Sequence, residues 1–113
     1  MRTEYARIWE FVVVPDHAYD FERAYGPFGD WVQLFRRSTL FLRLALHRDL
    51  QEPRRFMTID YWESQESIEG LRGRYAAEFE ALESRCERYF DHRAAIGRFE
   101  MLRYGQYRAI GPR

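Results

Sequence analysis

Apolar and polar side chains alternate, or β-branched and aromatic side chains concentrate, in four segments of the chain. Residues 7–14 are rich in Val, Ile and aromatic residues and stop at Pro15. Residues 39–47 and 55–62 alternate with a period of two. A period of two is typical of β-strands, and proline ends them. We therefore predict strands in these three segments and a fourth strand over residues 96–102.

Apolar residues recur at steps of three and four in the segments between the predicted strands. After Ser64, a good N-cap residue, this spacing runs over about 22 residues as far as Tyr89 and Phe90 and predicts a long helix. Gly70 and Gly73 lie inside it and weaken a helix, so we expect a kink or a late start there. Two shorter segments show helical spacing: 18–25 and 30–37.

The predicted element order is β-α-β-β-α-β, the order of a ferredoxin-like α+β fold with an antiparallel four-stranded sheet. Residues 1–102 form this one domain, and residues 103–113 form a polar tail that should lie over the surface. Two helices cover only one face of such a sheet, yet both faces of the strands carry large apolar residues. A second copy of the chain would cover the other face most simply, so we predict a homodimer.

Composition excludes several classes of protein. The chain has 113 residues, and its 18 basic residues, all Arg, balance 18 acidic ones. A nucleic-acid-binding protein of this size usually has a basic excess, so we expect no nucleic-acid partner. No apolar run is long enough to span a membrane, and the N-terminus lacks the apolar stretch of a signal peptide. We expect a cytoplasmic protein without a membrane partner.

Sequence motifs for cofactors are missing. The three histidines do not stand at metal-ligand spacing, and neither of the common glycine-rich phosphate-binding motifs occurs. The sequence therefore predicts no metal and no nucleotide cofactor. Cys86 falls on the apolar side of the long helix, where a buried thiol is the simpler interpretation. The chain contains no Lys, which excludes a Schiff base.

Four polar residues interrupt the predicted strands: Glu10, Arg43, His47 and Asp60. Asp60 lies between Ile59 and Tyr61, and a carboxyl group on the face toward the helices would need a partner. These residues either form an interior network that fixes the dimer or line a pocket.

Aromatic residues make up 18% of the chain. Nine of them should meet between sheet and helices: Trp9, Phe11, Phe21, Phe28, Trp31, Phe35, Trp62, Tyr75 and Phe79. The simplest interpretation is a core. A core of flat rings with a few polar groups also suits a planar aromatic ligand.

Several stretches of the chain together match the pattern of one known family. They are IWEFVV at 8–13, FERAYGP at 21–27, GDW at 29–31 with LFRR at 34–37, TIDYWES at 58–64 and GRFE at 97–100. With these stretches the chain resembles the antibiotic biosynthesis monooxygenase-like family of dimeric α/β-barrel proteins. The resemblance covers residues 5–101, and the Trp-Glu-Ser that closes the third strand is its most telling part. The resemblance implies a ferredoxin-like subunit that pairs into a dimeric barrel.

The resemblance also implies two chemistries. Some relatives oxidise phenolic or quinol-type aromatics with O₂ and no metal or flavin, using an Asn, a Trp four positions later and a Tyr six positions after the Trp. Trp62 matches the Trp, whereas Thr58 and Ile68 stand at the other two positions. Other relatives degrade haem through an Asn, a Trp and a His. Here the chain has no Asn, and Leu71 and Ala81 occupy the other two positions, which argues against haem degradation.

Two functions from different classes follow. The first is a cofactor-independent monooxygenase for a small aromatic, in which Asp60 or His47 is the base, with Glu10 as a further candidate, and Arg43 stabilises oxyanion charge. The substrate-binding candidates are Trp62, Trp31, Thr58, Trp9, Phe11 and Tyr75. The second is a non-catalytic dimer that binds a small hydrophobic molecule, which a salt bridge between Asp60 and Arg43 would favour. A purely structural dimer is a third interpretation.

Overall fold

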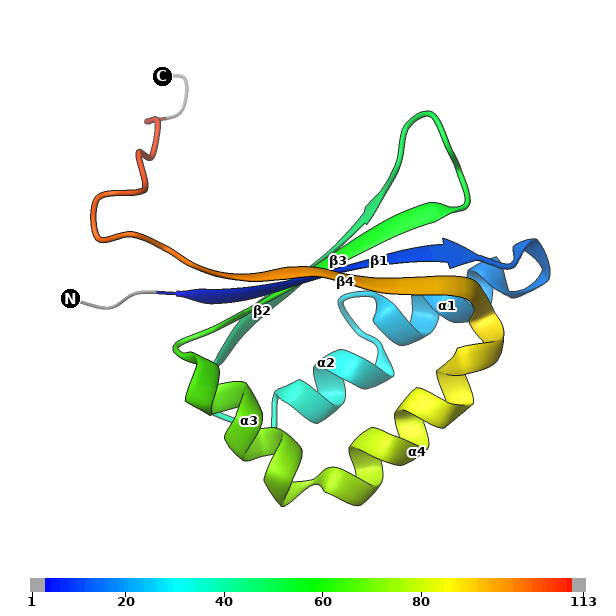
Figure 1. The fold of residues 1–113 in the computed structure, drawn as a ribbon, viewed down its shortest axis with the longest axis horizontal. Coiled ribbons are helices and arrows are strands. Elements are labelled where there is room, and N and C mark those ends of the chain that lie inside the picture. The colour runs from blue at the N-terminus through cyan, green and yellow to red at the C-terminus, as the bar shows by residue number, and fades with distance from the viewer. Residues whose placement is uncertain (1–3, 111–113) are drawn as a thin grey trace.

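A computed structural model describes residues 4–110, in which four antiparallel strands form one sheet and the helices lie on one face of it (Figure 1). The strands are β1 (Tyr5–Val13), β2 (Phe41–Arg48), β3 (Arg55–Trp62) and β4 (Phe90–Glu100). The helices are α1 (Ala18–Tyr25), α2 (Asp30–Phe35), α3 (Gln65–Arg74) and α4 (Ala76–Cys86), with short 3₁₀ turns η1 (Pro15–His17) and η2 (Glu87–Tyr89).

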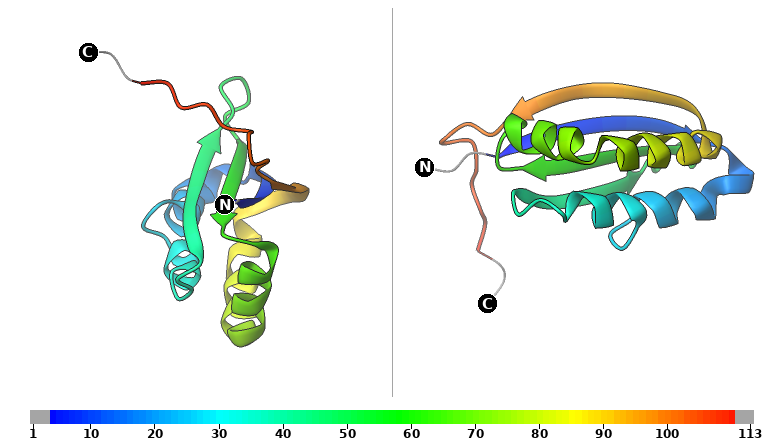
Figure 2. Two further views of the ribbon diagram at one scale, coloured as in Figure 1. Left: turned by 90° about the vertical axis from the view of Figure 1, so that its left-hand side faces the viewer. Right: turned by 90° about the horizontal axis from the view of Figure 1, so that it is seen from below.

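The sheet has the strand order β2-β3-β1-β4. Each neighbouring pair is antiparallel, and β1 and β3 lie in the middle. This order, with helices following β1 and β3, confirms the ferredoxin-like α+β fold. Figure 2 shows that one face of the sheet carries all the helices, while none of them covers the other face.

Strand alternation separates an inner face, toward the helices, from an outer face. In β3 the inner residues Phe56, Thr58, Asp60 and Trp62 are all buried, while the residues between them are only partly covered. Trp62, with none of its surface exposed, lies against the rings of Phe35 and Phe41. Packing of large apolar residues against the helices therefore fixes which face of each strand is buried.

The predicted long helix is divided into α3 and α4 at Tyr75. Ser64 caps α3 as expected, since its hydroxyl oxygen accepts a hydrogen bond from the Ser67 N–H. The break falls two residues after Gly73, where the backbone of Tyr75 leaves the helical conformation and its side chain packs against the core. The glycines weaken the helix, and the break that results lies just after them in the sequence.

The start of β4 differs from the prediction, because the strand begins at Phe90 and not at residue 96. Phe90 pairs with Val13 and packs on the ring of Phe11, whereas the sequence pattern places it in the helix. Irregularities in the β1–β4 register interrupt the alternation along β4. A register shift interrupts the two-residue period of apolar side chains. The sequence pattern therefore misses the first half of the strand.

The turn between α1 and α2 explains a second difference. Phe28, expected in the core, is 91% exposed because it lies at the tip of this turn. Gly29 follows it, and a side chain there would collide with the carbonyl oxygens of Arg23 and Ala24. Only glycine permits this close approach of α1 and α2.

Residues 101–110 continue from β4 without helix or strand. The tail was expected to lie over the surface, but this segment extends away from the sheet (Figure 1), and Leu102 to Ile110 are exposed. None of the helices described here is long and apolar enough to cross a membrane.

Replacing Trp62 with Ala should lower the free energy of unfolding by about 3–5 kcal/mol, because it leaves a large cavity in the core. Urea unfolding with an unchanged slope measures this loss. Phe28→Ala is the matched control and should change stability by less than about 0.5 kcal/mol. Equal stability of the two variants would show that Trp62 is not part of a packed core.

Candidate functional site

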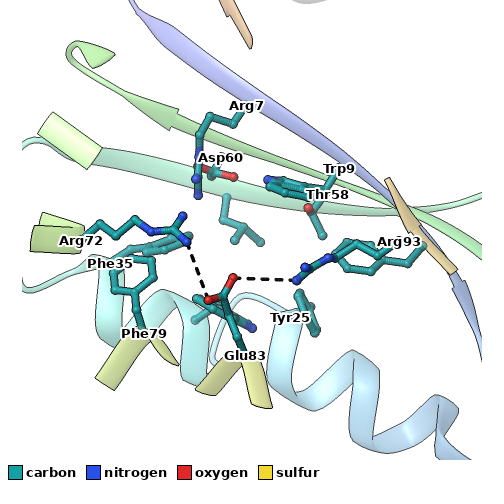
Figure 3. Close-up of a pocket in the computed structure, with 13 residues that line it drawn as sticks. Arg7, Trp9, Tyr25, Phe35, Thr58, Asp60, Arg72, Phe79, Glu83 and Arg93 are labelled. Atoms are coloured by element: carbon teal, nitrogen blue, oxygen red, sulfur yellow. Dashed lines mark hydrogen bonds and ion pairs between the residues drawn. The ribbon is translucent and has the colours of Figure 1, made fainter. Parts of the chain in front are cut away.

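A cavity of about 50 Å³ lies between the inner face of the sheet and helices α2, α3 and α4. Aromatic rings form much of its wall, and charged groups lie at its back and its mouth (Figure 3). Its lining residues are Arg7, Trp9, Phe11, Tyr25, Trp31, Phe35, Leu44, Thr58, Asp60, Arg72, Phe79, Glu83 and Arg93. A space of this size holds one or two water molecules, so a larger ligand requires side chains to move.

Asp60 stands at the centre of the cavity's sheet wall and is 2% exposed. Its Oδ2 accepts two hydrogen bonds, one from Nε of Arg7 at 2.7 Å and one from Nε1 of Trp62 at 2.6 Å. Arg7 lies directly opposite on β1, and Trp62 is two residues further along β3. The guanidinium compensates the buried carboxylate charge, which would otherwise be very costly.

The second oxygen of the Asp60 carboxylate accepts no hydrogen bond within residues 4–110, since both bonds are made by Oδ2. An ionised carboxylate has lone pairs on both oxygens. Oδ1 can therefore accept a proton or a hydroxyl hydrogen bond from a molecule in the cavity. This makes Asp60 the best-placed proton acceptor among the lining residues.

The mouth of the cavity is formed by a chain of three charged side chains. Glu83 of α4 lies between Arg72 of α3 and Arg93 of β4, as Figure 3 shows. The N···O distances are 3.7 and 3.8 Å, and these side chains are the most exposed among the charged lining residues. These three ion-paired side chains cover a cavity whose lining is otherwise largely aromatic.

The wall near α1 and α2 contains further polar groups. Burial raises the pKa of the Tyr25 hydroxyl well above its usual range, and the nearby Cys86 contributes in the same direction. Burial likewise raises the pKa of the Cys86 thiol. The buried Nε1 of Trp31 has no hydrogen-bond partner among the described residues. A ligand or water that reaches this N–H would satisfy it.

Five of the residues selected from the sequence line this cavity: Asp60, Thr58, Trp9, Phe11 and Trp31. Trp62 lies behind the wall and reaches the cavity only through its hydrogen bond to Asp60. Tyr75 lies outside it, at the break between α3 and α4, with the guanidinium of Arg37 4.8 Å from the centre of its ring.

Arg43 and His47 lie on the outer face of the sheet, opposite to Asp60, because they pair with Tyr61 and Met57. Arg43 bonds to Glu4 and covers the ring of Tyr61. Within residues 4–110, Arg43 and His47 therefore form no network with Asp60, and the partner of Asp60 is Arg7 rather than Arg43.

Glu10 also faces outward, since it pairs with Met57 on β3. A hydrogen bond from Arg55 holds the pKa of Glu10 below its usual range, and His92 adds to this effect. Glu10 is thus part of a surface ion-pair group on the outer face and does not reach the cavity.

Sequence reasoning missed the basic residues of the site. Arg7 alternates with Trp9 and Phe11 along β1, a signal that was available in the sequence and that places it on the inner face. Arg93 could not be found this way because its part of β4 shows no clear alternation. Arg72 and Glu83 stand on helix surfaces, where charged residues are usually solvated.

The comparisons with known proteins concern structure alone. No model of a protein family and no curated protein matches the chain. A proposed antibiotic biosynthesis monooxygenase from Nitrosomonas europaea superposes with a TM-score of 0.69 at 13% identity, covering 94% of this chain and 97% of that one. PA3566 from Pseudomonas aeruginosa gives 0.62 at 20% identity, covering 91% and 96%. SnoaB, a cofactor-independent oxygenase from Streptomyces nogalater, gives 0.58 at 16% identity, covering 97% and 98%.

The chain has the fold of these proteins. The alignments span nearly the whole of each chain, so the whole ferredoxin-like unit is shared. Several of the matched proteins carry the antibiotic biosynthesis monooxygenase name. At these identities the similarity establishes architecture, and function has to be argued from the site.

Replacing Arg7 with Met should lower the free energy of unfolding by about 3–5 kcal/mol, because Asp60 is left buried without a counter-charge. The double variant Arg7→Met with Asp60→Asn should regain part of the lost free energy of unfolding, because the buried negative charge is then absent. Arg43→Met is the control, since its exposed pair with Glu4 contributes about 1 kcal/mol or less. Chemical denaturation of the parent, of Arg7→Met and Asp60→Asn alone and of the double variant measures the coupling, and losses that simply add would contradict a direct Arg7–Asp60 interaction.

Proposed function

We propose that this protein is a cofactor-independent monooxygenase that acts on a small phenolic or quinol-type aromatic. The observation that carries the proposal is a buried carboxylate, Asp60, with an unbonded oxygen in a cavity walled by aromatic rings. Stacking on these rings would orient a flat substrate. The shared fold with a protein described as a cofactor-independent oxygenase supports this choice.

In the proposed reaction, Asp60 takes the phenolic proton of the substrate through Oδ1. The guanidinium of Arg7, bonded to the other carboxylate oxygen, supplies positive charge near the phenolate. The phenolate has carbanion character at a ring carbon, and this carbon transfers electrons to O₂ and forms a carbon–oxygen bond, which gives a hydroperoxide once Asp60 returns the proton it took. The O–O bond and the C–H bond at the same carbon then break. One oxygen atom stays as the new carbonyl oxygen, and the other leaves as water with that hydrogen, so the substrate itself is the reductant and no external donor is required.

The substrate would lie between Trp9 and Thr58 on the sheet and Trp31 on α2. Thr58 is buried at the cavity wall, at the position where the resemblance places an Asn. Ile68, at the position of the Tyr, is buried in the core. The chain therefore uses Asp60 as base in place of those groups, which distinguishes its mechanism within this fold.

We further propose that two copies pair through the outer face of the sheet. Partly exposed apolar side chains lie along this face: Ile8, Val12, Met57, Ile59, Tyr61 and Phe99. A second sheet packed on them would remove this area from water. Pairing of this kind leaves the cavity, which lies on the inner face, free for substrate.

The alternative is a non-catalytic module that binds a small aromatic. The charge compensation of Asp60 by Arg7 favours it, because a carboxylate whose charge is compensated in this way can serve the scaffold alone. The two functions share one cavity and differ in turnover, so a single assay with a binding readout separates them.

Purified, metal-free protein should consume O₂ above the buffer rate with a hydroquinone, anthrone or flavonol. Asp60→Asn should reduce this rate about a hundredfold or more, since general base catalysis contributes about that much. Asp20→Asn, on the exposed side of α1, should keep the full rate. Uptake that persists in Asp60→Asn would remove Asp60 as the base. Quenching of Trp fluorescence without any uptake would favour the binding module.

Ile59→Arg, in the centre of the outer face, should convert a dimer into a monomer, because it buries an unpaired charge in the contact. Sedimentation velocity measures the change. Tyr19→Arg is the control on the helical side, where Tyr19 is 72% exposed, and should remain dimeric. A parent protein that sediments as a monomer at all concentrations would refute this pairing.

A further inference from the structure

We infer that the ligand of this cavity is an aromatic acid, whose carboxylate binds between Arg72 and Arg93 in the place that the Glu83 carboxylate now occupies. The inference rests on the proposed function in placing the substrate in the cavity, and it adds the chemical class of that substrate. The ring would lie among the aromatic side chains, and the acid group would lie at the mouth.

Glu83 itself shows that one carboxylate can serve both arginines. Its Oε1 lies 3.7 Å from Nη2 of Arg72, and its Oε2 lies 3.8 Å from Nη1 of Arg93 (Figure 3). Neither distance is short enough for a hydrogen bond. Within residues 4–110 these three side chains make no hydrogen bond to any other side chain.

The internal ion pairs are therefore weak and easily exchanged. Arg72 is 54% exposed and Arg93 is 36% exposed, and long pairs between such groups contribute little. A free carboxylate could approach each guanidinium at hydrogen-bonding distance, where charge-assisted and bidentate bonds form. Exchange of Glu83 for the ligand thus replaces two long contacts with short ones.

Arg72 and Arg93 also lie close to the aromatic rings of the cavity wall, so one ligand could place its ring on the wall and its acid group at these arginines. The guanidinium of Arg93 is 5.2 Å from the centre of the Trp9 ring, and that of Arg72 is 5.7 Å from the centre of the Phe79 ring. Both rings line the cavity. A molecule that fills the space between these rings would carry its acid group directly under the two guanidinium groups.

Charge and volume point to the same class of ligand. Among the lining residues three arginines face two acids, and Arg7 is already bonded to Asp60. This leaves Arg72 and Arg93 with only Glu83, an excess of one positive charge at the mouth. The cavity of about 50 Å³ is too small for a ring while Glu83 occupies the mouth, so binding of the proposed ligand requires Glu83 to turn away from the mouth.

Calorimetric titration with 1-naphthoate and its neutral counterpart 1-naphthamide tests the inference. Neither compound has a phenolic proton, so the result does not depend on oxygenase activity. The parent protein should bind naphthoate at least tenfold more tightly than naphthamide. Arg93→Gln and Arg72→Gln should each weaken naphthoate about tenfold and leave naphthamide within twofold. Arg23→Gln, an exposed arginine of α1 outside the cavity, is the matched control and should change neither affinity.

Glu83→Gln distinguishes exchange from general attraction by positive charge. It removes the internal competitor, so naphthoate should bind about fivefold or more tightly, with naphthamide unchanged. Equal affinities for the two compounds, equal weakening of both in the arginine variants, no binding of either compound, or weaker naphthoate binding in Glu83→Gln would overturn the inference. A naphthoate preference in a protein that consumes no O₂ would uphold this inference and refute the oxygenase function separately.

Discussion

The carboxylate of Asp60 is buried at the centre of the sheet, and the arrangement around it depends on keeping that charge compensated. Moving a carboxylate out of water costs several kcal/mol unless an opposite charge and hydrogen bonds accompany it. Arg7 provides the charge from the neighbouring strand and Trp62 provides a hydrogen bond from the same strand. The Asp60 carboxylate thus helps to fix both the register of β1 on β3 and the position of Trp62 in the core.

The same pair lines the cavity. Arg7 and Asp60 lie on its sheet wall, and aromatic rings form much of the rest of the lining. The stability of the sheet and the proposed function then depend on one residue, because without Arg7 the carboxylate of Asp60 would be a buried charge with no counter-charge. Binding of a substrate hydroxyl to its free oxygen offers a way to use the charge without breaking the pair with Arg7.

The sequence predicted the fold where periodicity was undisturbed. The strand over residues 55–62 and the helix over residues 18–25 have the predicted bounds, because apolar burial enforces their period. The start of β4 was missed because irregular pairing with β1 interrupts the alternation. Phe28 was placed in the core because a large apolar residue gives no sign that it lies at the tip of a turn.

The site was predictable only in part, for a related reason. Alternation placed Asp60 and Thr58 on one face of their strand. Which strands lie next to β3, and in which register, decides what faces them. Arg43 and His47 lie on β2, the neighbour of β3, but they pair with the outer-face residues Tyr61 and Met57. Their side chains therefore point outward, away from Asp60. The arginines at the mouth come from α3 and β4, segments far apart in sequence, and only the tertiary structure brings them to one carboxylate.

The most direct test of the proposed site is whether an aromatic molecule enters the cavity beside Asp60. A two-dimensional ¹H–¹⁵N spectrum resolves the three Trp indole N–H signals, and titration with 1-naphthol follows them. If 1-naphthol enters the cavity, the signals of Trp9 and Trp31 should shift with the same affinity, together with that of Trp62 through its bond to Asp60. Unchanged indole signals, or shifts confined to residues of the outer face such as Phe99, would contradict it.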